Sequence, residues 1–158
     1  MALAIGTPAP NIVLKGMIDG ELKEVNLADH KGKDNVVLLF FPGAFTGVCT
    51  TEFCDVSSGL AGLPTDGAAV YGISGDTAFA QAAWAKANNI TVKLLADYTH
   101  KTIEAYDVVL PDLAGMGPSS LRAAYIIDKE GVIRYVQVTP TPGDLPDFGA
   151  INEALASL

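Results

Sequence analysis

The chain has 158 residues, about the length of one domain, with a net charge of −8 and only two cysteines. The charge and the presence of only two arginines disfavour nucleic acid as a partner, because such binding depends on lysine and arginine at phosphates. The N-terminus lacks the basic region and long apolar core of a signal peptide, and the longest strongly apolar run, residues 36–41, is too short to span a bilayer. We therefore expect one domain over residues 1–158, in the cytoplasm, with no membrane partner.

Short apolar runs alternate with helical patterns along the chain. Alternation of this kind predicts an α/β fold, in which a central mixed sheet is flanked by helices on both faces. Turn residues at 18–20 and at 128–131 predict two hairpins, the first of them N-terminal. The predicted elements are, in chain order, an arm of a hairpin at 21–25, a strand at 35–41, a helix from 46 or 47 to 60, a strand at 68–74, a helix at 77–88, a strand at 92–96, a helix at 99–106, a hairpin of 123–127 with 132–138, and a helix at 148–158.

Both cysteines lie in one short stretch that follows the apolar strand at 35–41. Active sites of α/β sheets lie at the carboxyl ends of central strands, so this stretch is a candidate site. With Thr46 as the N-cap of the helix, Cys49 falls at position N3, near the free N–H groups and the positive end of the helix. Thiols in that position ionise more readily than free cysteine. Cys49 is therefore a candidate nucleophile.

Cys54 allows two interpretations. In an ideal helix, residues five apart are separated by about 7.5 Å along the axis, so the two Cα atoms lie roughly 8 to 9 Å apart. A disulfide usually needs less than about 7 Å, so a Cys49–Cys54 bond requires the helix to unwind first. Alternatively, Cys54 is a buried small apolar residue. A metal site is disfavoured, because the spacing is unusual for zinc and because His30 and His100 are better interpreted as solvated caps.

The residues of this stretch resemble the peroxiredoxin family. Pro42-Gly-Ala-Phe-Thr46-Gly-Val-Cys49 matches the family's Pro-x-x-x-Thr-x-x-Cys motif, and Glu52 follows at a distance common there. The likeness extends over nearly the whole chain: a Gly-x-Pro-Ala-Pro opening, the Phe-Phe-Pro strand end, Ser74-Gly-Asp76 with Trp84 in the next helix, and Arg122 just before Ala-Ala-Tyr-Ile-Ile-Asp.

The resemblance implies a thioredoxin-like fold and a thiol peroxidase that needs no metal or organic cofactor. Cys49 would be the peroxidatic cysteine, Pro42 would shield it, and Thr46 would orient the peroxide. Arg122 would stabilise the thiolate and the developing charge, and Glu52 would hold the arginine. The substrate would be hydrogen peroxide or an organic hydroperoxide.

The resemblance leaves the role of Cys54 open. Its spacing is similar to that of the bacterioferritin-comigratory, or Q-type, subgroup, in which the second cysteine resolves the first. Phe-Thr-Gly-Val-Cys and the acidic, proline-rich C-terminal segment look closer to the one-cysteine alkyl hydroperoxide reductase E type, in which an external thiol resolves. We expect a thioredoxin-type or low-molecular-weight thiol as reductant and a homodimer packed around the Pro42 loop. The interchain mechanism of the typical two-cysteine type is excluded, since no cysteine lies near the C-terminus.

Two other functions would use the same thiols differently. A redox sensor or binding module would use Cys49 once rather than in repeated turnover. A thiol-disulfide oxidoreductase is disfavoured, because Cys-x4-Cys does not place the second sulfur within easy reach. Of the remaining segments, Gly115–Ser120 is expected to be a mobile loop covering the site, Arg134 a solvent-facing strand residue, and Trp84 and Phe40 part of the core.

Overall fold

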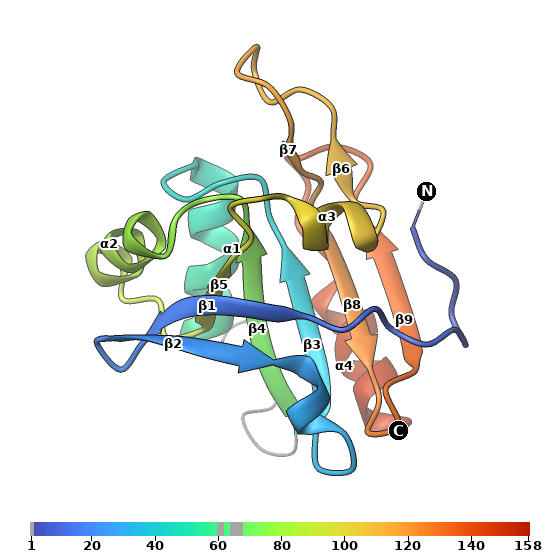
Figure 1. Cartoon of the computed structure of the whole chain (residues 1–158). Coiled ribbons are helices and arrows are strands. Elements are labelled where there is room, and N and C mark those ends of the chain that lie inside the picture. Colours follow the sequence, from blue (N-terminus) through green and yellow to red (C-terminus); the bar gives the residue numbers. More distant parts are fainter. Residues whose placement is uncertain (1, 60–61, 64–67) are drawn as a thin grey trace.

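A computed structural model describes residues 2–59, 62–63 and 68–158, and Figure 1 shows their arrangement. The main sheet has the strand order β2-β1-β5-β4-β3-β8-β9. Strands β3, β4 and β5 run parallel, whereas β8 pairs with β3 in the antiparallel sense, so the sheet is mixed as predicted. The strands are β1 (Val13–Ile18), β2 (Glu21–Asn26), β3 (Asn35–Phe40), β4 (Ala68–Ser74), β5 (Lys93–Ala96), β8 (Ala123–Ile127) and β9 (Ile133–Val138), with β6 (Val109–Leu110) and β7 (Ser119–Ser120) forming a separate pair.

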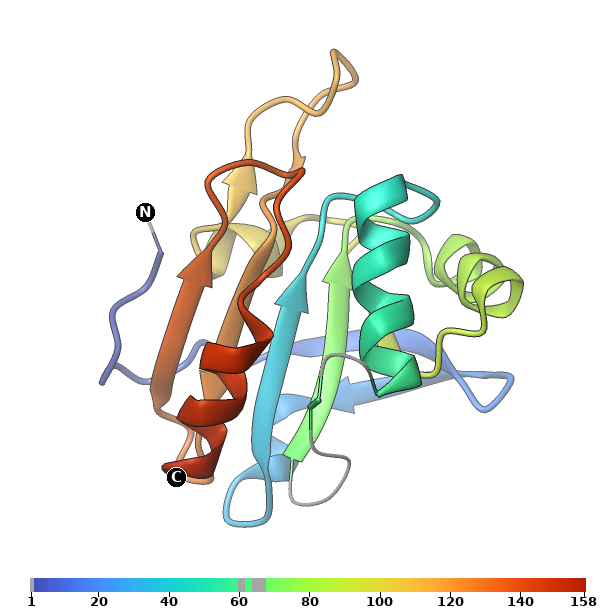
Figure 2. The ribbon, with the colours of Figure 1, turned by 180° about the vertical axis from the view of Figure 1, so that it is seen from behind.

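Helices cover both faces of the sheet. Seen from behind in Figure 2, α1 (Gly47–Ser58) and α4 (Phe148–Ala156) lie across one face, and α3 (Lys101–Ala105) lies on the other. Helix α2 (Ala78–Asn88) packs beside β1 and β5. A short 3-10 helix (Leu27–His30), not predicted, follows β2.

Alternate side chains of β3 enter two separate cores, which is why this strand is apolar throughout. Leu38 and Phe40 pack toward α3 and the N-terminal hairpin, whereas Val37 and Leu39 pack toward α1 and α4. Trp84 is fully buried in the second core, where its ring lies beside Phe41 and Phe53, and Phe40 is fully buried in the first. The predictions for Trp84 and Phe40 are thus confirmed.

Most predicted elements agree with the structure within two residues at each end, and the strand at 68–74 is found as predicted. The helix predicted over 99–106 is shorter: His100 is its N-cap and has a left-handed backbone (φ 63°), so the helix starts only at Lys101, and it ends at Ala105. The helix predicted to end at 60 ends at Ser58, where Gly59 turns left-handed at φ 82°; Leu60 lies outside the described residues.

Two expectations are corrected. His30 is not a solvated cap: its Nδ1 lies 2.9 Å from a carboxylate oxygen of Asp34 and its Nε2 lies 2.7 Å from the hydroxyl of Tyr71. The segment 115–120 is only partly a loop, because Ser119 and Ser120 are buried in β7. Its remainder is braced by the Asp112 carboxylate, which accepts the backbone N–H groups of two glycines. None of the helices in the described ranges has the length and apolarity needed to cross a bilayer.

Candidate active site

The site begins where β3 ends and α1 begins, at the carboxyl end of a central strand. Thr46 is the N-cap of α1 in extended conformation, so Cys49 stands at N3 as predicted. The Thr46 hydroxyl does not cap the helix; it donates to the carbonyl of Gly43 at 2.9 Å, which leaves its lone pairs available to accept a hydrogen bond. Cys49 is fully buried, which is unusual shielding for a residue expected to react.

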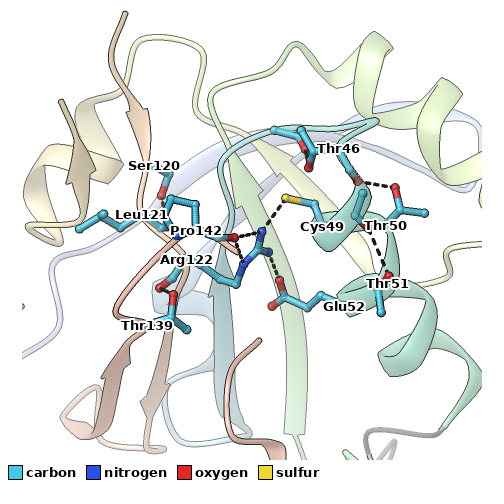
Figure 3. A network of polar contacts seen from close by, with 12 residues as sticks. Thr46, Cys49, Thr50, Thr51, Glu52, Ser120, Leu121, Arg122, Thr139 and Pro142 are labelled. Carbon is cyan, nitrogen blue, oxygen red and sulfur yellow. Dashed lines mark hydrogen bonds and ion pairs between the residues drawn. The ribbon is translucent and has the colours of Figure 1, made fainter. Parts of the chain in front are cut away.

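Arg122 brings the distant parts of the site together, as Figure 3 shows. One Nη2 donor lies 3.1 Å from Cys49 Sγ, and Nη1 donates to the carboxylate of Glu52. Nε and Nη2 also donate to the carbonyl of Pro142, at 3.1 and 2.9 Å. Arg122 is 2% exposed, so a permanent positive charge faces the sulfur with little water nearby to weaken the attraction.

The carboxylate of Glu52 compensates the charge of Arg122, but burial destabilises its ionised form. Its side chain is fully buried, one oxygen is paired with Arg122, and the other, Oε1, has no hydrogen-bond partner among the described residues. Burial raises the pKa of Glu52 to about 7, because loss of hydration outweighs the attraction of Arg122. Conversely, Glu52 and Cys49 together raise the pKa of Arg122 despite its burial, so the arginine stays charged.

Sequence analysis did not predict the roles of two groups that contribute to the site. The Pro142 carbonyl comes from the loop after β9, and a backbone acceptor gives no sequence signal. Trp84 was expected to fill the core, yet its Nε1–H also donates to the Thr50 hydroxyl at 3.0 Å, and that hydroxyl donates to the carbonyl of Thr46. The second turn of α1 is thereby tied to the N-cap and to α2.

Cys54 is not part of this network. It lies in the same continuous helix, half-buried against the second core, and its Sγ lies 3.6 Å from the carbonyl oxygen of Asn88. Both cysteines are free thiols. Since α1 is intact between them, a bond from Cys49 to Cys54 would require the first turns to unwind.

The guanidinium beside the sulfur supplies a positive charge and an N–H donor that can meet negative charge on a leaving oxygen, which is what attack on a peroxide needs. Arg134, by contrast, is exposed, as expected for a solvent-facing strand residue, and it pairs with Asp128 at 2.6 Å. In the described part of the chain no group of three or more His, Cys, Asp or Glu residues is arranged to hold a metal ion.

Comparison with known proteins settles the family. Residues 5–136 match the AhpC/TSA family. The chain is 37% identical to peroxiredoxin-2 of Pongo abelii, over 96% of this chain and 84% of that protein, and 34% identical to a thioredoxin peroxidase of Echinococcus granulosus, over 100% and 81%. The chain belongs to the peroxiredoxin family. Solved peroxiredoxin structures agree: the reduced 2-Cys peroxiredoxin of Plasmodium vivax superposes with a TM-score of 0.85 at 28% identity, over 96% of this chain and 80% of that one.

A second structure, a peroxiredoxin-like protein from Aquifex aeolicus, superposes with a TM-score of 0.83 at 29% identity, over 99% of this chain and 88% of that one. The thioredoxin-like fold predicted from the motif is therefore confirmed. This peroxiredoxin is a thiol-dependent peroxidase, an oxidoreductase that uses a peroxide as substrate and a thiol as reductant. The subgroup within the family stays a prediction.

Proposed function

We propose that this peroxiredoxin reduces hydrogen peroxide or organic hydroperoxides with Cys49 as the peroxidatic residue. The observation that carries the assignment is the 3.1 Å contact between Arg122 Nη2 and Cys49 Sγ at the start of α1. Thr46 would orient the peroxide with its hydroxyl, and buried Pro42 would keep water from the sulfur. Glu52 would hold Arg122 in place through its ion pair.

The chemistry balances with these residues alone. The Cys49 thiolate attacks one oxygen of ROOH, the O–O bond breaks, and RO⁻ leaves and takes up a proton to become ROH. The sulfur is oxidised to sulfenic acid, Cys–SOH, and the peroxide is reduced. Arg122 Nη2 already faces the sulfur, so it can meet the charge as it moves to the leaving oxygen without reorganising.

Resolution of the sulfenic acid is the second step. If Cys54 is the resolving residue, its thiol condenses with Cys–SOH, releases water and forms an intrachain disulfide, which an external dithiol reduces. If Cys54 is structural, an external thiol reacts with Cys–SOH directly. A reductant of the thioredoxin type is supported by the name of the Echinococcus granulosus relative. Two free thiols fit a reducing compartment, and we propose the cytoplasm.

We also propose that the protein acts as a homodimer packed around the Pro42 loop. Large apolar side chains there are mostly exposed: Phe45 in the loop itself at 63%, Phe79 in the first turn of α2 at 67%, and Tyr98 after β5 at 68%. All three segments follow the carboxyl ends of the parallel strands (Figure 1). Exposed aromatic groups gathered at one end of a sheet are typical of a surface that a partner covers.

The test treats the reduced protein with one equivalent of hydrogen peroxide and follows intact mass, free thiols and peptide maps for the wild type, Cys49→Ser and Cys54→Ser. We expect fast oxidation of Cys49 and, with a thioredoxin system added, repeated turnover. A disulfide in the wild type and added oxygen in Cys54→Ser would identify Cys54 as resolving. Slow, single oxidation without turnover would instead favour a redox sensor, and no fast reaction at Cys49 would refute the proposal.

A further inference from the structure

The loop of residues 42–46 is attached to the rest of the molecule at two points. On one side, the hydroxyl of Ser119 in β7 donates to the carbonyl of Pro42. On the other side, the backbone N–H of Ala44 donates to a carboxylate oxygen of Asp76 at 2.8 Å. Directly after Ala44, Phe45 holds a left-handed backbone (φ 64°), a conformation that a bulky residue keeps only when its surroundings impose it. The shape of the loop is therefore set from outside it.

Asp76 is itself held firmly. The Ser74 hydroxyl donates to the same oxygen of Asp76 at 2.8 Å, and it accepts a hydrogen bond from Nε2 of Gln81 at 2.9 Å. Gln81 is 1% exposed and is anchored to the sheet through the carbonyl of Leu95, also at 2.9 Å. A chain of hydrogen bonds thus runs from β5 through α2 and the end of β4 to the amide of Ala44.

We propose that Asp76 is a positioning residue for peroxide capture, acting through the Ala44 amide to align the loop that carries Pro42 and Thr46. The inference rests on the proposed function of that loop. The hydrogen bonds of Asp76 go to Ala44 and Ser74, not to Cys49 or Arg122, so its effect is on the peroxide and not on the sulfur. Misplacing a reacting group by about 1 Å can cost on the order of 100-fold in rate.

This separation of roles can be measured with two electrophiles. Iodoacetamide needs only an accessible thiolate, whereas hydrogen peroxide must also be aligned by the loop. We expect Asp76→Ala to lower the rate constant of Cys49 with hydrogen peroxide about 10- to 100-fold and to change that with iodoacetamide less than about 3-fold. Asp76→Asn keeps an acceptor at the same position and should restore most of the peroxide rate.

Asp128→Ala is the matched control, since Asp128 also accepts backbone N–H groups, at 2.9 and 3.0 Å, but in the turn between β8 and β9, away from the site. Both of its rates should equal those of the wild type. Ser74→Ala, which removes the hydroxyl that donates to Asp76, should show the same selective loss, but a smaller one, because the hydrogen bond from Ala44 to Asp76 remains. If Asp76→Ala does not fold, the two rate constants of Ser74→Ala test the role of Asp76 in its place.

The outcomes separate this inference from the proposed function. A wild type whose Cys49 reacts no faster with peroxide than with iodoacetamide would overturn both. A fast wild type with an unchanged Asp76→Ala, or with a variant that loses both rates in parallel, would overturn only the role of Asp76. A selective loss of the peroxide rate, reversed by asparagine, supports it.

Discussion

The first turns and the last turns of α1 give the same side chain two different environments. Cys49 is fully buried, faces the guanidinium of Arg122, and sits in a turn that Thr50 and Trp84 tie down. Cys54, five positions later, is half-buried and faces a neutral carbonyl of α2. The helix end favours an anion at Cys49, but the decisive cation comes from 73 positions away in the chain. We therefore expect the tertiary contacts of each cysteine to decide which of the two thiols in this helix reacts with a peroxide.

The largest effect is expected at the cation. Arg122→Lys should lower the rate constant for oxidation of Cys49 by hydrogen peroxide by about 10² to 10³, because a single ammonium cannot serve Cys49, Glu52 and the Pro142 carbonyl together. Stopped-flow fluorescence would measure the rate. Arg134→Lys, at the exposed arginine, is the control and should leave it unchanged. If the wild type and Arg122→Lys were oxidised at equal rates, Arg122 would not be what makes Cys49 differ from Cys54.

A pH-dependent effect is expected at Glu52. Since the pKa of Glu52 in the folded protein is raised from 4.5 to about 7, its contribution to stability is fully present below about pH 4.5 and is lost as the pH rises through 7. Glu52→Gln does not titrate, so its free energy of unfolding should gain on that of the wild type between pH 4.5 and pH 8. The gain should reach at most about 3 kcal/mol.

Urea unfolding at several pH values would measure this gain, with Glu21→Gln, at an exposed position of β2, as control. A constant difference in the free energy of unfolding between Glu52→Gln and the wild type over the whole pH range would show that the pKa of Glu52 is not raised in the folded protein.

A smaller effect is expected where Trp84 holds the helix. Trp84→Phe keeps an aromatic ring in the core but loses the donor to Thr50, and should lower the free energy of unfolding by about 1 to 2 kcal/mol. Amide hydrogen exchange should speed up around Thr50 and stay unchanged around Cys54. Tyr98→Phe, at an exposed position, controls for the change of aromatic residue. Uniform acceleration along α1 would mean that its two halves open as one unit.

The smallest effect is expected at Cys54. Under reducing conditions, Cys54→Ala should change the free energy of unfolding by less than about 1 kcal/mol, because the thiol is half-buried and its one polar contact is weak. Thermal unfolding would measure the change, and Thr51→Ala, on the exposed side of the same helix, gives the baseline for a substitution by alanine. A loss of 2 kcal/mol or more would make Cys54 a structural core residue.

Periodicity and turn residues were sufficient to predict the main strands and helices, because local preference and burial agree in them. They failed where a contact distant in sequence decides the outcome. The pairing of Ser119 and Ser120 with β6 depends on a hairpin whose two-residue strands are too short to show a pattern. His30 was predicted to be a solvated cap because its partner Tyr71, which contacts it from β4, is distant in the sequence and no local pattern indicates the contact.

The same limit applies to the site. The family motif, with its downstream arginine, indicated Cys49, Thr46, Pro42, Glu52 and Arg122, and the structure brings Cys49, Glu52 and Arg122 into contact. Arg122 would not have been chosen over Arg134 without the resemblance, since both lie in apolar segments near a strand. The Pro142 carbonyl and the Asp76 acceptor could not be foreseen, because their roles depend on backbone groups that every residue carries.

The Arg122 network also has a consequence during synthesis of the protein on the ribosome. Its partners span residues 49 to 142, so the site cannot form until nearly all of the chain has left the exit tunnel. Until then, Cys49 has no cation beside it and remains an ordinary, slowly reacting thiol. We expect a nascent chain to be resistant to peroxide, so that irreversible oxidation of the sulfur threatens only molecules that have finished folding.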